Sequence, residues 1–558
     1  MAVEPCRAGS ATWSADPTSG IWNTMANWVP NTVPHSPSDI ATFAASNITE
    51  VTTEAGIIDV DSVVLDANAS PFQIVIGVGS VFKFNGTGVV NHSQAVQSFA
   101  LEVTDETGSG LFFYGSATAG ELTQFNNAGS YVFFEDESTA GKATFTTSEI
   151  GARQGNLIFF NDTTAAEATI ATVGNSFTTF YDDSTADREV FTASEGGSVV
   201  FSTNSTAERA SIECSGATEP GPRGGVNFDT SATAAQSHVV VDGAAVAGAA
   251  GNEIIISDSA TGGSATFVVN GGAATGAEGA TMNFHEESTA GAASITINPG
   301  TNGGAAGSLF FFERADGGTA SIALLGGSQM DIGKRADPGV TIGSLAGDGP
   351  VFLGAKNLTI GSNNQSTAFS GVLQDGGINQ GTGGSLSKIG SGLLTLSGAN
   401  TYTGGTTVSA GALAVRNTTG SATGTGPVQV NGGTLAGAGS IAGAVTLGSG
   451  SGTGAVLSPG QGASKPTRLT LESSLTLKAD ATYRYRLNLK KAKSDLVTAN
   501  GITSRAGRSS TSSRSAAAGC VRAKWLPCST TPPRRRSPAP SPTCAKGRPW
   551  RRAATRCR

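Results

Sequence analysis

The sequence predicts an all-β chain whose short strands stack into a solenoid. Three observations support this class. Runs in which apolar and polar residues alternate recur along the chain, and Gly, Asn or Ser closes each run. Residues 111–333 repeat one phrase at a nearly fixed spacing, as stacked structural units do. The 77 Gly residues and a charged fraction of 14 % describe a polar, turn-rich chain.

Residues 1–43 are expected to form an N-terminal segment with a Trp-rich cap. Trp13, Trp22, Trp28 and Phe43 form the one cluster of large rings before the C-terminal tail. The first coil of a solenoid has no neighbour on one side, so bulky side chains are needed over its core. The alternative is a platform of Trp rings for stacking sugars, as in a carbohydrate-binding module.

Residues 44–385 are expected to form a β-helix with diverged repeats of 21–29 residues, beginning with strands near 48–53, 56–65, 72–77 and 80–84. Each repeat contains an aromatic pair or a variant of it, acidic or amide residues, a Ser-Thr-Ala variant and an alternating strand. One ring of each pair should point inward and stack on its neighbours at the strand spacing of about 4.8 Å. The copies begin at Phe112, Phe133, Phe159, Phe180, Val200, Asn227, Asn283 and Phe311.

The most specific pattern is LSKIGSGLLTLSGANTYTGGTTVSAGALAV at residues 386–415. It contains short alternating strands separated by Gly- and Asn-rich turns, and helix formers are nearly absent. The pattern resembles the passenger-associated transport repeat of bacterial autotransporters, also called the autotransporter-associated β-strand repeat. The matching positions are Lys388, Gly390, Gly392, Leu394, Leu396, Gly398, Asn400, Thr401, Tyr402, Gly404, Thr406, Val408, Gly411, Leu413 and Val415.

The resemblance covers residues 386–501 and defines a section of the chain at 386–503. It implies a right-handed parallel β-helix that is exported and displayed at the surface of a Gram-negative-type bacterium, or secreted. The implied function is non-enzymatic adhesion or surface display, with the repeat at 386–415 aiding export and folding. The implied partners are the outer-membrane translocation machinery and a host-surface or glycan ligand. The family transfers no catalytic residue and no cofactor.

Residues 504–558 differ from everything before them. They contain no acidic residue, 14 of the 35 Lys and Arg residues and four of the six Cys residues. We expect a disordered, basic, low-complexity tail that arises from a reading-frame shift near codon 503. The alternative is a natural basic tail that binds nucleic acid or heparin.

Residues 1–504 are strongly acidic. They carry all 42 acidic side chains and 21 of the 35 basic ones, a net charge of −21. This charge favours solubility and argues against nucleic acid as a partner.

The start of the chain has no recognisable export signal. Residues 1–17 lack the apolar segment of a signal peptide, and no run of 18 apolar residues predicts a transmembrane helix. Taken literally, this predicts a cytosolic protein. We instead expect an extracellular or surface protein whose signal peptide and membrane anchor are missing from this gene model.

A few polar groups are candidates for chemistry. The acidic corners Glu135–Glu137, Asp182–Asp183 and Glu286–Glu287 are open to three interpretations: solvated turns, a Ca²⁺ row, or the acid and base of a polysaccharide hydrolase. His285 beside Glu286 is the one His–carboxylate pair. No zinc-ligand spacing or nucleophile motif occurs. We therefore predict no catalytic, metal or cofactor site; the alternative function is that of a β-helix polysaccharide lyase or hydrolase.

Overall fold

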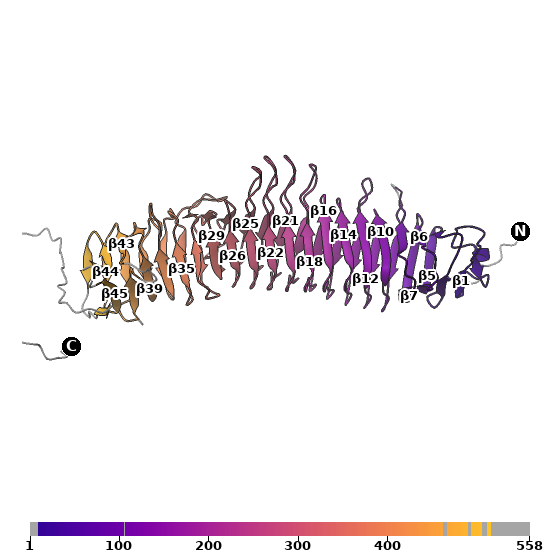
Figure 1. The fold of residues 1–558 in the computed structure, drawn as a ribbon, viewed down its shortest axis with the longest axis horizontal. Helices are drawn as coiled ribbons and strands as arrows, with labels where there is room; N and C mark the ends of the chain where they lie inside the picture. The colour runs from indigo at the N-terminus through magenta and orange to yellow at the C-terminus, as the bar shows by residue number, and fades with distance from the viewer. Residues whose placement is uncertain are drawn as a thin grey trace, which may run out of the picture. The chain divides into compact units, whose positions relative to one another are not determined.

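The computed structural model describes residues 9–104, 107–336, 338–452, 454–460, 466–488, 493–504 and 510–514. These residues wind into a parallel β-helix in which each strand pairs with the equivalent strands of the neighbouring coils (Figure 1). The predicted all-β solenoid is confirmed. A single 3₁₀ turn, η1 (Met25–Asn27), is the only helical element in the described ranges.

The first side of the coils, face 1, is a parallel ladder that runs from β1 to β33. The pairing of β1 with β2 is antiparallel, and the other described strand pairs of face 1 are parallel. Its strands are β1 (Ala11–Trp13), β2 (Trp28–Val29), β3 (Ile40–Phe43), β5 (Gly56–Leu65), β7 (Ser80–Asn91), β9 (Gly110–Phe113), β11 (Tyr131–Phe134), β13 (Asn156–Phe159), β15 (Phe177–Phe180), β17 (Ser198–Phe201), β19 (Gly225–Phe228), β21 (Glu253–Ile256), β23 (Thr281–Phe284), β25 (Ser308–Phe311), β27 (Gln329–Asp331), β30 (Val351–Phe352) and β33 (Leu373–Gln374).

The second side, face 2, is a parallel ladder along the whole described solenoid, joined by one short antiparallel strand, β46 (Lys493–Ser494). Its other strands are β4 (Glu50–Thr52), β6 (Gln73–Ile76), β8 (Gln97–Leu101), β10 (Glu121–Ala128), β12 (Lys142–Ser148), β14 (Thr169–Val173), β16 (Val190–Ser194), β18 (Ser211–Cys214), β20 (His238–Val241), β22 (Thr266–Val269), β24 (Ser294–Ile297), β26 (Ser321–Leu324), β29 (Ser344–Gly347), β32 (Thr367–Phe369), β35 (Leu393–Leu396), β37 (Ala412–Val415), β39 (Gly433–Gly437), β42 (Ala455–Ser458), β45 (Ala481–Asn488) and β49 (Ser510–Arg514).

The third side becomes a sheet only from Gly339 onward. This face 3 contains β28 (Gly339–Ile342), β31 (Asn357–Ile360), β34 (Ser385–Lys388), β36 (Gly405–Val408), β38 (Val428–Val430), β41 (Val445–Leu447), β44 (Leu475–Leu477) and β48 (Ile502–Ser504). A smaller sheet beside it contains β40 (Ser440–Ile441), β43 (Arg468–Leu471) and β47 (Leu496–Thr498).

In the coils that contain residues 118–289, a single Thr per coil takes the place of face 3. The Thr residues bridge from coil to coil, with Asp316 following the last of them, and each Thr hydroxyl accepts a hydrogen bond from the N–H group two residues later. The side chain thereby closes a tight local turn, which explains the recurring Ser-Thr-Ala phrase. The row consists of Thr118, Thr139, Thr164, Thr185, Thr206, Thr233, Thr261 and Thr289.

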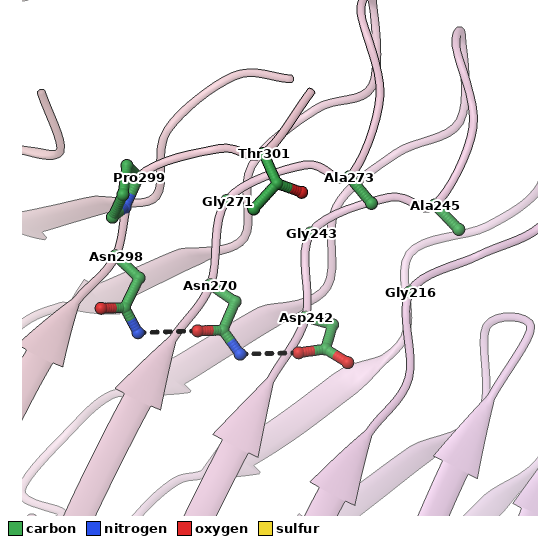
Figure 2. A pocket seen from close by; sticks show the side chains of 10 residues that line it. All are labelled: Gly216, Asp242, Gly243, Ala245, Asn270, Gly271, Ala273, Asn298, Pro299 and Thr301. Carbon is green, nitrogen blue, oxygen red and sulfur yellow. Dashed lines mark hydrogen bonds between the residues drawn. The ribbon is translucent and has the colours of Figure 1, made fainter. Parts of the chain in front are cut away.

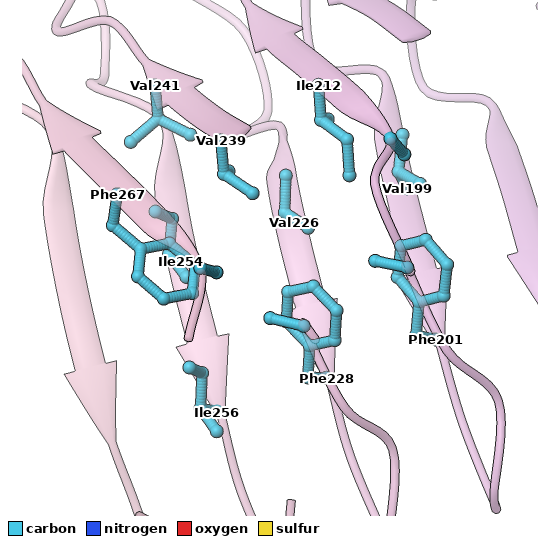
Figure 3. Close-up of a cluster of buried hydrophobic side chains, with 14 of the residues drawn as sticks. Val199, Phe201, Ile212, Val226, Phe228, Val239, Val241, Ile254, Ile256 and Phe267 are labelled. Atoms are coloured by element: carbon cyan, nitrogen blue, oxygen red, sulfur yellow. The ribbon is translucent and has the colours of Figure 1, made fainter. Parts of the chain in front are cut away.

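The core lies between faces 1 and 2, where successive residues of most strands alternate between buried and more exposed positions. In Figure 3, Val226 and Phe228 of β19 lie among side chains from neighbouring strands of both faces, including Ile212 of β18 and Val239 of β20. Because each coil buries its apolar positions against the coils beside it, the core is continuous along the helix axis.

One inward column of face 1 is a ladder of Phe rings. Neighbouring rings in it are nearly parallel, with centroids 4.5–5.0 Å apart, as expected from the strand spacing. This confirms that one ring of each aromatic pair points inward. The ladder consists of Phe84, Phe113, Phe134, Phe159, Phe180, Phe201 and Phe228.

The three N-terminal Trp rings are buried inside the first coils. Trp13, Trp22 and Trp28 are at most 1 % exposed, and their edges and faces meet at centroid distances of 4.9–5.0 Å. Each indole N–H donates to a backbone carbonyl oxygen. Since no ring face is open to solvent, the alternative of a sugar-stacking Trp platform is excluded.

The strand ladder continues into the segment predicted as the tail. β49 (Ser510–Arg514) pairs in parallel with β45 on face 2. β48 ends at Ser504, and β49 is one further strand within the predicted tail. Residues 515–558, which make up most of the predicted disordered tail, lie outside the described residues.

A search of the described ranges finds no helical segment with the length and hydropathy needed to cross a membrane.

The Phe ladder generates a stability prediction. Replacing Phe159, which lies between Phe134 and Phe180, with Ala should cost about 3–5 kcal/mol because it opens a cavity and removes two stacked contacts. The outward Phe160→Ala variant is the matched control and should cost much less. Urea unfolding followed by circular dichroism measures both variants. Equal losses would contradict the assignment of the stabilisation to the inward ladder.

Glu189 occupies an inward position that a small Ala side chain occupies in the two neighbouring coils. Val190 N–H donates a hydrogen bond to the Ala168 carbonyl oxygen, and Ser211 N–H donates to the Glu189 carbonyl oxygen. These bonds place Glu189 between Ala168 of the preceding coil and Ala210 of the following coil. The side chain is buried, and neither carboxyl oxygen has a hydrogen-bond partner in the described part of the chain. Burial therefore raises the pKa of Glu189 well above its ordinary value.

This raised pKa predicts a pH-dependent stability. In the unfolded chain the pKa of Glu189 is about 4.3. Below this pH the carboxyl is protonated in both the folded and the unfolded state, so its ionisation does not lower the free energy of unfolding. As pH rises above that value, only the unfolded chain ionises, so stability falls by about 1.4 kcal/mol per pH unit until the folded carboxyl also ionises. Glu189→Ala should remove this slope and raise the urea midpoint at pH 7.5, whereas Glu213→Ala, at an exposed site, should not. A Glu189→Ala variant with the wild-type slope would contradict this account.

Candidate functional site

The transport-repeat motif at residues 386–415 occupies two successive coils. Its strands are β34 and β36 on face 3 and β35 and β37 on face 2. In both faces the paired strands run parallel and in unbroken register. The motif is therefore part of the solenoid wall and does not form a separate module.

The apolar positions of the motif point into the core. In β35 every second residue is buried, which accounts for the Leu-x-Leu spacing, whereas all four residues of β37 are buried. The following inward side chains are at most 1 % exposed: Leu386, Leu394, Leu396, Val408, Leu413 and Val415.

The glycines of the motif are required by close approach between coils. A Cβ atom at any of the five would overlap a backbone carbonyl oxygen of the preceding coil. Gly390 and Gly411 also adopt positive φ values of 65° and 63°. The five pairs of glycine and carbonyl are Gly390 with Gly361, Gly392 with Gln365, Gly398 with Gly371, Gly404 with Gly383, and Gly411 with Gly390.

Asn400 joins three successive coils through one buried side chain. Its Oδ1 accepts a hydrogen bond from Leu373 N–H in the preceding coil at 2.8 Å. Its Nδ2 donates to the Ala422 carbonyl oxygen in the following coil at 2.6 Å. The backbone N–H of Asn400 donates to the Ser421 carbonyl oxygen at 2.8 Å. The side chain is 3 % exposed, so these bonds are shielded from water. We call this arrangement the Asn400 clamp.

Two neighbours of Asn400 complete the corner. Thr401 N–H donates to the Leu373 carbonyl at 3.0 Å, while the Thr401 side chain is exposed. The buried Tyr402 hydroxyl lies 2.5 Å from Thr406 Oγ1. Burial raises the pKa of Tyr402 above its ordinary value despite this hydrogen bond, so the phenol stays neutral.

Lys388 is a buried cation at the end of β34. Its Nζ donates to the carbonyl oxygens of Ile389 and Gly390, the latter at 3.1 Å, and it forms no ion pair in the described ranges. Burial lowers the pKa of Lys388. The ammonium group thus stabilises the turn between β34 and β35. Together the motif residues supply packing and coil-to-coil hydrogen bonds; none is arranged as an acid–base or nucleophile pair.

The acidic corners have a structural role that the sequence interpretations did not include. At each corner a carboxylate oxygen accepts a backbone N–H bond from the preceding coil, at 2.9–3.2 Å. No group of three or more His, Cys, Asp or Glu residues suited to a metal is found among the described residues. The acceptors and the residues whose N–H groups they bind are Asp136 with Gly115, Asp182 with Asn161, and Glu286 with Asp258.

His285 does not pair with Glu286 as its sequence neighbour suggested. Its Nδ1 lies 3.4 Å from Glu313 Oε2 of the next coil, and its ring stacks on Phe312 at 4.5 Å. Glu286 lies in the turn that follows β23, with a φ of 50°, and its carboxylate accepts the Asp258 N–H bond of the preceding coil instead.

A shallow depression of about 510 Å³ lies where strands β20, β22 and β24 end and loops project (Figure 2). Asn298 Nδ2 donates to Asn270 Oδ1 and Asn270 Nδ2 donates to Asp242 Oδ1, both at 2.7 Å. Asp242 carries the only carboxylate among the described residues that line it. A glycoside hydrolase needs two carboxyl groups across the scissile bond, so this depression does not supply that chemistry.

Comparison with known proteins gives two matches. Residues 386–415 match the model of the passenger-associated-transport-repeat family. A stretch of 104 residues is 38 % identical to the Adhesin BmaC autotransporter of Brucella suis biovar 1 (strain 1330), covering 17 % of this chain. The matched stretch spans only 3 % of that relative's length. No solved structure matches.

The repeat model matches the residues that carry the coil-joining contacts, and the chain around them is a parallel β-helix. The chain therefore carries a passenger-associated transport repeat at residues 386–415 and is similar, over 104 residues, to part of an autotransporter adhesin.

Proposed function

We propose that this passenger-type β-helix is a non-enzymatic adhesin, displayed at the cell surface or released from it, whose transport repeat promotes folding during export. The observation that carries the folding role is the Asn400 clamp, which ties three coils through one buried side chain. The name of the matched relative, an adhesin, supports the adhesive role.

The physical argument for the folding role starts from the solenoid itself. A coil cannot bury its own apolar face, so the first stable group of coils limits how fast the structure forms. In residues 386–415, inward Leu and Val side chains are combined with hydrogen bonds that reach both neighbouring coils. This section is suited to form that first group, on which the other coils then add one by one.

Such a group also aids export. We propose that the outer-membrane translocation machinery passes the chain unfolded and that coils near the transport repeat fold first outside the cell. Folding then opposes backward sliding, because each added coil buries apolar area that unfolding would expose again.

Asn400→Ala tests the folding role. It leaves Leu373 N–H and the Ala422 carbonyl buried without their partner, which should cost about 2–4 kcal/mol. Hydrogen exchange should show lower protection throughout residues 386–415, and the amount of protein exported should fall. Thr401→Ala is the matched control because that side chain is exposed. If both variants keep wild-type protection and export, the transport repeat does not have this role.

The adhesive role requires a separate assay. Bacteria that display the passenger should bind a layer of host cells several-fold better than the same bacteria with residues 44–385 deleted, provided that surface levels are matched. The purified full chain should release no reducing ends from acidic or neutral polysaccharides. Equal binding by the two strains would refute adhesion, and release of reducing ends would favour the hydrolase alternative.

A further inference from the structure

Six mutually stacked aromatic rings lie on the solvent side of four successive coils of face 1. They alternate along the chain with the inward Phe ladder and lie on or directly after β9, β11, β13 and β15. Tyr131 is 43 % exposed and the other five are half-buried. We call this set the aromatic stripe; it consists of Phe112, Tyr114, Tyr131, Phe133, Phe160 and Tyr181.

The rings of the aromatic stripe cover each other's faces. Phe112 and Phe133 stack at 4.8 Å, Phe133 and Phe160 at 6.3 Å, and Phe160 and Tyr181 at 5.1 Å, with interplanar angles of 12–16°. Lys83 lies over the ring of Tyr114, 5.9 Å from its centroid. Because the faces between stacked rings are occupied, Phe133 and Phe160, in the interior of the stack, present ring edges to solvent. The aromatic stripe is an apolar strip that crosses the strands, not a platform for stacking sugars.

The fold itself does not require aromatic side chains in these outward columns. The column that contains Phe112 and Phe133 continues in register through Ile158, Thr179, Val200 and Asn227. The same strand position therefore accepts polar side chains in neighbouring coils. A contiguous apolar strip on the outside of an otherwise polar solenoid is typical of an interaction surface.

The corners that follow these strands place carboxylates along one border of the aromatic stripe. Asp136 and Asp182 accept backbone N–H bonds, as described above. The other carboxylates of these corners form no hydrogen bond or ion pair in the described part of the chain. We call this second group the acidic rim; it consists of Glu135, Glu137, Asp162 and Asp183.

We propose that the aromatic stripe and the acidic rim bind a polypeptide segment in which apolar and basic side chains alternate. The stripe offers contact area to apolar side chains, and the rim attracts Lys and Arg. A second copy of this chain is disfavoured because two acidic rims would repel each other, as would an anionic polysaccharide or lipid surface. The inference rests on the proposed adhesive role and names the partner class for this surface.

Synthetic peptides test the inference with the full-length chain. A fluorescein-labelled peptide of four Lys-Phe repeats should bind, as measured by fluorescence anisotropy in 50 mM NaCl. A peptide of four Glu-Phe repeats and a peptide of four Lys-Ser repeats should each bind at least about tenfold more weakly. The first peptide lacks positive charge, and the second lacks apolar side chains. Equal binding of either control peptide would overturn the inference, and so would no binding of the Lys-Phe peptide.

Variants then locate the site. Phe133→Ser should weaken binding of the Lys-Phe peptide by about tenfold, whereas Val200→Ser, in the same outward column, should leave it unchanged. The pair Glu135→Gln and Glu137→Gln should also weaken binding and reduce its dependence on salt. Circular dichroism and the urea midpoint verify that each variant is folded. If Val200→Ser weakened peptide binding as much as Phe133→Ser, the proposed location of the site would be wrong.

A further comparison distinguishes failure of the peptide-binding site from failure of the proposed adhesive role. Bacteria that display the Phe133→Ser passenger are compared with wild type in the host-cell assay. If the peptide fails to bind but wild-type bacteria still adhere through residues 44–385, the aromatic stripe is not the binding surface and adhesion stands. If the peptide binds at the stripe but the bacteria do not adhere, the site stands and the adhesive role falls.

Discussion

The structure depends on register between coils, in which the same position of successive coils lies directly above its equivalent. The Phe ladder expresses this most clearly, since its ring centroids are 4.5–5.0 Å apart along face 1. A slip of one residue in any coil would turn its inward side chains to solvent and its outward ones into the core. Because each coil contacts only its neighbours, every such interface must be favourable by itself.

Register also explains the mixed chemistry of the corners. The position occupied by Asp136 is occupied in the following coils by Asn161, Asp182 and Thr203. Each of these side chains accepts a backbone N–H bond from the coil before it. An acceptor oxygen is all that the position requires, so acid, amide and hydroxyl replace one another. A row of Ca²⁺ ligands would need more oxygens per site than these single contacts provide.

The transport repeat meets the same constraint with different means. Where the earlier coils use Thr bridges and stacked rings, residues 386–415 use a third sheet, glycines at points of close approach and the Asn400 clamp. A clamp that reaches both neighbours couples three coils at once. Stronger coupling is what a section that folds early needs, and it links the local geometry to the proposed role in export.

Much of this protein follows from the sequence alone. Alternation and turn residues determined the all-β solenoid, and the aromatic pairs determined that one ring of each pair faces inward, because a strand places successive side chains on opposite faces. The transport repeat was also recognisable, by the resemblance of residues 386–415 to a known family. Other features depend on which coil positions meet. Asn400 contacts Leu373 and Ala422, and His285 contacts Glu313 and not its neighbour Glu286. Glu189 is buried and Phe133 joins an outward stripe for the same reason. Coil lengths vary along the chain, so only the folded stack decides which residues, 20 or more positions apart, lie side by side.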